Sequence, residues 1–146
     1  MFYTGKDAAI FLIQQDFIDT ALIPLVPISF DSKEIPQAAS QADYLLSLVN
    51  ALENQFKGRV VAFPSFSYVK TQNKQQLVNE WKTASVDSPF KNTFYLTTDS
   101  EWIGLDENVL WTASIPLDSM DSKMRSKIIE DQIRQLIPRI AERWNS

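Results

Sequence analysis

Hydroxyl, carboxylate and aromatic side chains gather in four short stretches of the sequence, each directly after an apolar run. Ser29 and Asp31 follow "LIPLVP", Ser65, Ser67 and Tyr68 follow "VVAFP", Thr98, Asp99 and Trp102 follow "NTFYLT", and Asp118 follows "TASIP". Such groups beside aromatic faces can hold a polar small molecule or a sugar-like group. Polar turns and helix caps produce the same composition, so the pattern also fits ordinary strand ends.

The residue types that are missing limit the chemistry further. The chain has no histidine and no cysteine, which excludes a thiolate nucleophile, a Ser-His-Asp triad, an imidazole base and a Cys/His zinc site. Its three glycines stand apart in the sequence, so there is neither a GxGxxG turn nor a phosphate loop. The sequence therefore favours a protein without catalysis and without a cofactor.

An alternative hypothesis uses three of the carboxylates together. Asp31, Asp99 and Asp118 each follow an expected strand, and oxygen ligands suffice for a divalent ion such as magnesium. The chain would then be a carboxylate-dependent hydrolase or transferase, with Tyr68 or a serine nearby. The sequence has no DxD pattern, and helix capping also explains aspartates after strands.

The elements that would position these residues alternate along the chain. Apolar spacings of three and four, with capping residues, predict helices over residues 4–16, 36–57, 72–85 and from about residue 119 onward. Apolar runs predict strands within "DTALIPLVPISF", "RVVAF", "NTFYLTTD" and "ENVLWTASIP". Pro64 ends the second of these strands, because proline supplies no ladder N–H.

This alternation is typical of an α/β fold. We predict one domain over residues 1–146 with three α/β/α layers and a mostly parallel sheet of about four strands. The last connection, "SEWIGLD", is short enough to allow an antiparallel final pair. Ligands bind at the carboxyl ends of strands in open parallel sheets, so the four polar stretches mark the expected site.

Composition and charge limit the partners and the cellular location that we expect for the protein. The chain has 146 residues, 45% of them hydrophobic, and a net charge of −4, which makes a nucleic-acid partner a poor expectation. No apolar run is long enough to span a membrane, and the first residues lack the pattern of a secretory signal. We expect a cytoplasmic protein that binds a small molecule or a protein partner.

The carboxyl-terminal helix carries a third hypothesis. Residues 123–143 hold six basic side chains against three acidic ones, so the helix could serve as an assembly surface, although a solvated basic face is the ordinary explanation. Pro138 is expected to kink or end the helix and leave "RIAERWNS" separately oriented. The candidate partner-binding residues are Arg125, Lys127, Arg134 and Trp144.

Three segments carry a resemblance to a known family. "DTALIPLVPISF", the helix ending in "ALENQFKGRVVAFPSFSYVK", and the sequel from "NEW" to "FYLTTD" resemble the YpiF-like family of uncharacterised bacterial proteins. The resemblance spans nearly the whole chain and implies no known activity.

A looser resemblance covers the first half of the chain. "LVPIS" and "AFPSFSY" are similar to segments of the creatininase-type amidohydrolases. Those enzymes place histidines and acidic metal ligands after the first and third strands, where this chain has "FDSKEIP" and "TTDSEWI" without histidine. The resemblance implies a version without the metal centre, and no catalytic residue carries over.

Overall fold

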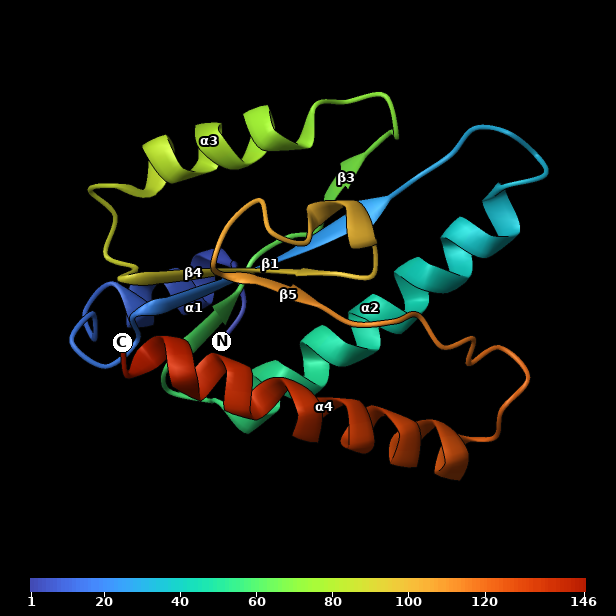
Figure 1. The fold of residues 1–146 in the computed structure, drawn as a ribbon. Coiled ribbons are helices and arrows are strands. Elements are labelled where there is room, and N and C mark those ends of the chain that lie inside the picture. The colour runs from blue at the N-terminus through green and yellow to red at the C-terminus, as the bar shows by residue number, and fades with distance from the viewer.

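A parallel sheet separates the helices into two layers (Figure 1). The computed structural model describes residues 1–146. The sheet order is β2-β1-β4-β5, and β3 also pairs with β1. The strands are β1 (Thr20–Pro27), β2 (Val60–Ala62), β3 (Phe66–Tyr68), β4 (Asn92–Thr97) and β5 (Val109–Trp111).

The helices cover both faces of this sheet. They are α1 (Gly5–Phe11), α2 (Ile35–Gln55), α3 (Lys74–Ser85), the short 3₁₀ helix η1 (Ser100–Trp102) and α4 (Ser122–Trp144). In Figure 1, α2 and α4 lie below the sheet and α3 lies above it. The predicted α/β fold with a mostly parallel sheet is confirmed. None of the helices combines the length and the apolar character that crossing a membrane requires.

Alternate residues of each strand face the two layers. Leu22 of β1 and Phe94 of β4 pack into the larger core between the sheet and the helices α2 and α4. Leu25 and Tyr95 pack into a smaller core between the sheet and the helices α3 and η1. The strands are therefore apolar on both faces, as strands covered by helices on both sides must be.

The edge strand beside β1 is interrupted by one extra residue. Thr20 pairs with Val60 and Leu22 with Ala62, but Leu25 pairs with Phe66, one residue later than this register would place it. Pro64 and Ser65 therefore occupy the place of one residue and form a bulge between β2 and β3. A one-residue shift reverses the face of every following side chain, so Phe66 and Tyr68 face α3.

The bulge also explains how the central strand β1 can contain a proline. The carbonyl of Leu22 accepts a hydrogen bond from the amide of Phe63, so backbone groups two residues later in β1 point toward the same edge. That residue is Pro24, which has no N–H to donate. Its missing donor faces the bulge, where the ladder is already broken.

The last pair of strands is parallel, so the antiparallel pairing that the short connection allows is wrong. Leu96 pairs with Leu110 in the parallel sense. The connection crosses the sheet because Trp102 of η1 is completely buried in the core beneath α3. Burial of this indole draws the chain over the sheet face and back to the sheet beside Tyr95 in β4, where β5 begins and the Tyr95 amide donates to the Asn108 carbonyl.

Two helix boundaries differ from the prediction. The helix α1 ends at Phe11, before the predicted Asp16. In contrast, α4 continues through Pro138 to Trp144, so the predicted break there is wrong. A proline inside a helix costs about 3 kcal/mol, but Leu136 and Ile140 on either side of it are buried in the larger core. Packing across the proline holds the helix together.

Trp144 therefore lies inside the fold, at the amino end of the sheet. Its ring packs edge-on against Phe56 at 5.0 Å between centroids, and the Arg59 guanidinium lies 3.8 Å above the ring centroid. Its Nε1–H donates to the Thr20 hydroxyl at 2.9 Å. The indole thus joins the end of α4 to β1 and α2.

This packing predicts that Trp144→Ala destabilises the fold by about 3 kcal/mol, because the half-buried indole leaves a cavity and the buried Thr20 hydroxyl loses a partner. Urea unfolding followed by circular dichroism measures the loss. Met124→Ala, on the same helix but 53% exposed, is the control and should change stability by less than about 0.5 kcal/mol. Equal effects of the two substitutions would mean that the end of α4 does not pack as described.

Candidate functional site

A crevice of about 350 Å³ opens at the carboxyl ends of β1, β3 and β4. We call it the strand-end crevice. Its lining consists of Pro27, Ile28, Ser29, Phe30, Glu34, Gln37, Ala38, Gln41, Tyr68, Val69, Lys70, Thr71 and Asp99. The sequence prediction placed a ligand site at this edge of the sheet, and the structure has a concave surface there.

The crevice lies at the point where the chain direction across the sheet reverses. From β1 the chain passes through α2 to β2 on one side, whereas β4, reached through α3, pairs with the other side of β1. The loops that leave β1 and β4 therefore separate toward opposite faces. Such a switch point is where open α/β sheets place their ligands.

A hydrogen-bonded network forms the floor of the crevice. The Tyr68 hydroxyl donates to Asp99 Oδ2 at 2.6 Å and accepts a hydrogen bond from the Trp102 indole N–H at 2.8 Å. Tyr68 and Trp102 are both buried, at 1% and 0% exposure. The Tyr68–Asp99–Trp102 network therefore fixes one carboxylate at the boundary between the core and the crevice.

Asp99 also begins η1. Its Oδ1 accepts from the Glu101 amide at 3.0 Å, as an N-cap does, and its own amide donates to Thr97 Oγ1 at 3.0 Å. Each carboxylate oxygen has accepted one hydrogen bond, and a carboxylate has about four acceptor positions. Asp99 can therefore still accept hydrogen bonds from a ligand.

The hydroxyl of Tyr68 is held in its protonated form. Burial and the hydrogen bond to Asp99 raise the pKa of Tyr68 above its ordinary value of 10.0. A general base needs a pKa near the working pH, so this shift has the wrong direction for a catalytic tyrosinate. Tyr68 acts as a hydrogen-bond donor that orients Asp99.

The two walls of the crevice meet through a second carboxylate. Glu34 Oε1 accepts from the Ser29 hydroxyl at 3.1 Å, and Glu34 Oε2 lies 3.6 Å from Lys70 Nζ. The loop after β1 and the loop after β3 therefore approach each other over the floor. Both members of this ion pair are largely exposed, so it contributes little to stability.

Behind the floor, Lys74 connects α3 to η1. Its Nζ lies 2.9 Å from Glu101 Oε2 and 5.4 Å from the centroid of the Tyr68 ring. The side chain of Lys74 is only 9% exposed. This ion pair holds η1 against α3 and so stabilises the position of Asp99.

The structure brings together some of the predicted ligand-binding residues. Ser29, Tyr68 and Asp99 line the crevice, and Trp102 lies beneath it. The Thr98 hydroxyl is buried and has no hydrogen-bond partner. Ser67 pairs with Val26 and therefore faces α2, and Ser65 lies on a different cleft.

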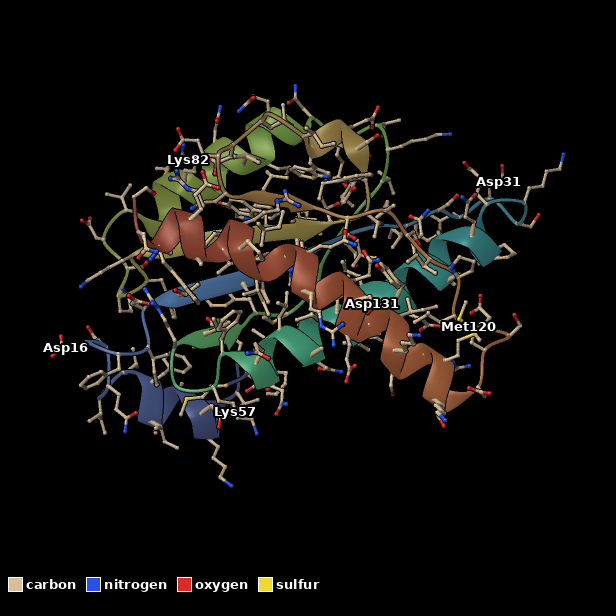
Figure 2. All side chains as sticks on the ribbon, turned by 60° about the horizontal axis from the view of Figure 1, so that its bottom comes forward. Asp16, Asp31, Lys57, Lys82, Met120 and Asp131 are labelled. Atoms are coloured by element: carbon tan, nitrogen blue, oxygen red, sulfur yellow. The ribbon has the colours of Figure 1, made fainter.

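The predicted convergence of three aspartates is wrong. Asp31 points outward from the loop that leads into α2 (Figure 2) and caps the Lys33 amide at 3.0 Å. Asp118 accepts from the Ser40 hydroxyl at 2.8 Å and does not line the crevice. No group of three or more acidic side chains that could hold a metal ion occurs in the structure. Local capping and packing, rather than a shared ligand, explain these carboxylates.

Glu34, Gln37, Gln41 and Lys70 are crevice residues that sequence reasoning missed. The three residues from the start of α2 share one helix face, because spacings of three and four residues place side chains on the same side. This polar stripe next to a predicted strand end was a signal available in the sequence.

Most of the predicted partner-binding residues make internal contacts. Arg125 donates to the carbonyls of Leu117 and Asp118 at 2.9 and 3.3 Å, and Arg134 pairs with Asp131 at 3.2 Å. Trp144 packs against the sheet as described above. Lys127 is exposed, and its role in binding a partner stays a prediction.

A family model described as "Protein of unknown function (DUF2487)" matches residues 9–144. The chain belongs to this family. The chain is also similar to the "Uncharacterized protein YpiF" of Bacillus subtilis (strain 168), with 27% identity over 143 residues, which cover 96% of this chain and 95% of the relative. The predicted resemblance to YpiF-like proteins is thus confirmed. No solved structure matches the chain significantly.

The Tyr68–Asp99–Trp102 network of this DUF2487 chain leads to a prediction about its stability. Tyr68→Phe removes the partner of the buried Trp102 N–H and should destabilise the fold by about 1–3 kcal/mol. Tyr3→Phe, at a tyrosine that is 57% exposed, is the matched control and should have almost no effect. Urea unfolding of both variants measures the difference, and equal stabilities would contradict the network.

Buried tyrosines also predict a loss of stability at alkaline pH. Burial and the nearby Asp106 carboxylate raise the pKa of Tyr95 from 10.0 to about 12. Between these values the unfolded chain releases the tyrosine proton and the folded chain retains it, so the contribution is complete below pH 10 and is lost as the pH rises toward 12. Urea unfolding at pH 9 and pH 11 should show lower stability at pH 11, and Tyr95→Phe should reduce that loss. No difference between wild type and variant would contradict the assignment.

Proposed function

We propose that the protein is a non-catalytic binding protein of the bacterial cytoplasm, and that a small polar ligand binds in the strand-end crevice. The observation that carries the proposal is the Tyr68–Asp99–Trp102 network at the switch point of the sheet. This network holds a carboxylate with free acceptor positions at the floor of a concave surface.

The crevice favours a ligand that donates hydrogen bonds. Asp99 and Glu34 supply carboxylate oxygens, and the amides of Gln37 and Gln41 can both donate and accept. The only basic side chain in the lining is Lys70. The ligand class that fits is a polyol or a primary amine, small enough for about 350 Å³.

The same chemistry argues against catalysis at this crevice. The raised pKa of Tyr68 keeps the hydroxyl protonated, and Asp99 already caps η1 and accepts from Tyr68. Both groups serve to position each other. A binding function uses this arrangement as it stands, whereas a general base would have to leave it.

A protein partner is the second candidate, and the loop after β1 favours it. Phe30 is 85% exposed at the mouth of the crevice, next to the partly exposed Ile28. An exposed aromatic ring beside a polar crevice is a common anchor in protein interfaces. A partner could contact Phe30 and place a donor group on Asp99.

A thermal-shift screen with sugars, polyols, primary amines and amino acids tests the proposal. A ligand at about 100 times its Kd stabilises the folded chain by roughly 2.7 kcal/mol, which raises Tm by several degrees. We expect a polyol or an amine to give this shift and Asp99→Asn to remove most of it.

Asp43→Asn is the matched control, because Asp43 lies exposed on α2 outside the crevice. It should leave the shift unchanged. A shift that survives Asp99→Asn would place the ligand elsewhere and contradict the proposal. If no compound shifts Tm, the result favours a protein partner over a small ligand. Capture of a protein from cell extract by the wild type but not by Phe30→Ser would support that second candidate.

A further inference from the structure

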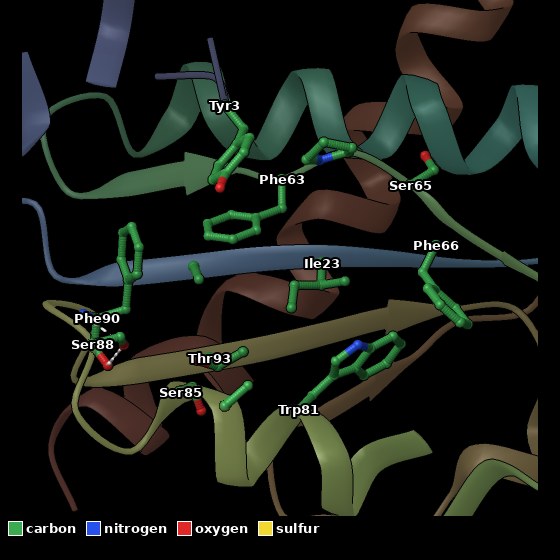
Figure 3. A pocket seen from close by; sticks show the side chains of 13 residues that line it. Tyr3, Ile23, Phe63, Ser65, Phe66, Trp81, Ser85, Ser88, Phe90 and Thr93 are labelled. Atoms are coloured by element: carbon green, nitrogen blue, oxygen red, sulfur yellow. Dashed lines mark hydrogen bonds between the residues drawn. The ribbon is translucent and has the colours of Figure 1, made fainter. Parts of the chain in front are cut away.

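A larger cleft lies on the opposite side of the sheet from α2 and α4. It has a volume of about 540 Å³ and lies between α3 and the amino-terminal segment. Figure 3 shows Ile23 of β1 and Thr93 of β4 at its floor, with Ser85 and Trp81 of α3 on one wall. We call it the aromatic cleft. Parallel sheets are ordinarily covered on both faces, so an open stretch over the two central strands is unusual.

Aromatic rings stand at both ends of this cleft (Figure 3). At one end, the centroid of Phe63 lies 4.6 Å from that of Tyr3 and 5.3 Å from that of Phe90. At the other end, Phe66 meets Trp81 edge-on at 4.5 Å. The opposing rings offer both faces and edges to a flat molecule.

The ring of Trp81 is held in place from behind. It stacks on Tyr95 with centroids 5.6 Å apart and on Trp102 at 6.4 Å. Both of these supporting rings are buried, at 1% and 0% exposure. The wall is therefore preformed, and binding would require little ordering of side chains.

The cleft contains no charged side chain. Eight of its 13 lining residues are hydrophobic, and the polar members supply hydroxyls from Ser65, Ser85, Ser88 and Thr93. Two of these are already bonded to backbone groups: Ser88 Oγ accepts from the Phe90 amide, and Ser85 Oγ donates to the Lys82 carbonyl. A charged ligand would lose its hydration here without meeting a counter-charge, which is costly.

We propose that the aromatic cleft binds a neutral, flat, apolar small molecule. Its volume lies within the roughly 300–1,000 Å³ of small-molecule sites. The floor strands β1 and β4 are paired on both sides, so they offer no free edge to which a partner's strand could add. The aromatic cleft and the strand-end crevice share no lining residue, so this proposal does not rest on the polar ligand of the crevice.

The test uses two dyes with the same ring system. N-phenyl-1-naphthylamine is neutral, and 1-anilinonaphthalene-8-sulfonate adds one negative charge. Fluorescence titration of the folded protein should show one site for the neutral dye and about ten-fold or more weaker binding of the anionic dye. Failure of the neutral dye to bind, or equal affinity for the two dyes, would overturn the proposal.

Substitutions then locate the site. Ala84→Phe adds a ring from exposed α3 into the cleft and should weaken binding of the neutral dye about ten-fold or more, because it fills the space. Ala39→Phe makes the same change on exposed α2 and should leave binding unchanged. Lys70→Ala, at an exposed residue that lines the crevice and not the cleft, should also leave it unchanged, which separates this site from the crevice.

A second pair of variants makes the test independent of the folding of Ala84→Phe. Ser85→Asp places a charge on the cleft wall, and Ser126→Asp places one on an exposed position of α4. The first should weaken binding of the neutral dye about ten-fold and the second should not. Undiminished binding in Ser85→Asp would overturn the proposed site.

Discussion

The register shift at Pro64 and Ser65 is the constraint on which both candidate sites depend. Before it, β2 follows the register Thr20–Val60, and after it β3 follows the register Leu25–Phe66. Without the extra residue, Ser65 and Ser67 would face α3, and Phe66 and Tyr68 would face α2. The bulge therefore decides that aromatic rings, rather than hydroxyls, meet α3 and η1.

The two sites use neighbouring residues of this one edge strand. Tyr68 reaches Asp99 and forms the floor of the strand-end crevice, whereas Phe63 and Phe66 stand at the two ends of the aromatic cleft. Trp81 and Trp102 stack on the α3 side of the sheet at 6.4 Å and so link the cleft wall to the crevice floor. A polar site at the strand ends and an apolar site on the sheet face thus share one aromatic support.

The opposite end of the sheet is closed by a separate polar network. The Thr20 hydroxyl donates to Asp19 Oδ1 at 2.9 Å and accepts from the Trp144 N–H. Arg59 pairs with the same Asp19 oxygen at 3.1 Å and covers the Trp144 ring. These contacts satisfy polar groups that strand burial would otherwise leave unpaired. They also explain why the basic carboxyl-terminal segment packs inward at its end.

The sequence by itself determined the alternation of helices and strands, the α/β class and the edge of the sheet where polar residues gather. It could do so because apolar periodicity and capping residues act within a few positions of one another. Contacts between distant residues decided the rest: the burial of Trp102 made the last pair of strands parallel, and packing of α4 carried the helix through Pro138. The partner of Asp99 and the walls of the aromatic cleft depend on a one-residue shift in strand pairing. Register is a property of two strands together, so only the tertiary structure could decide it.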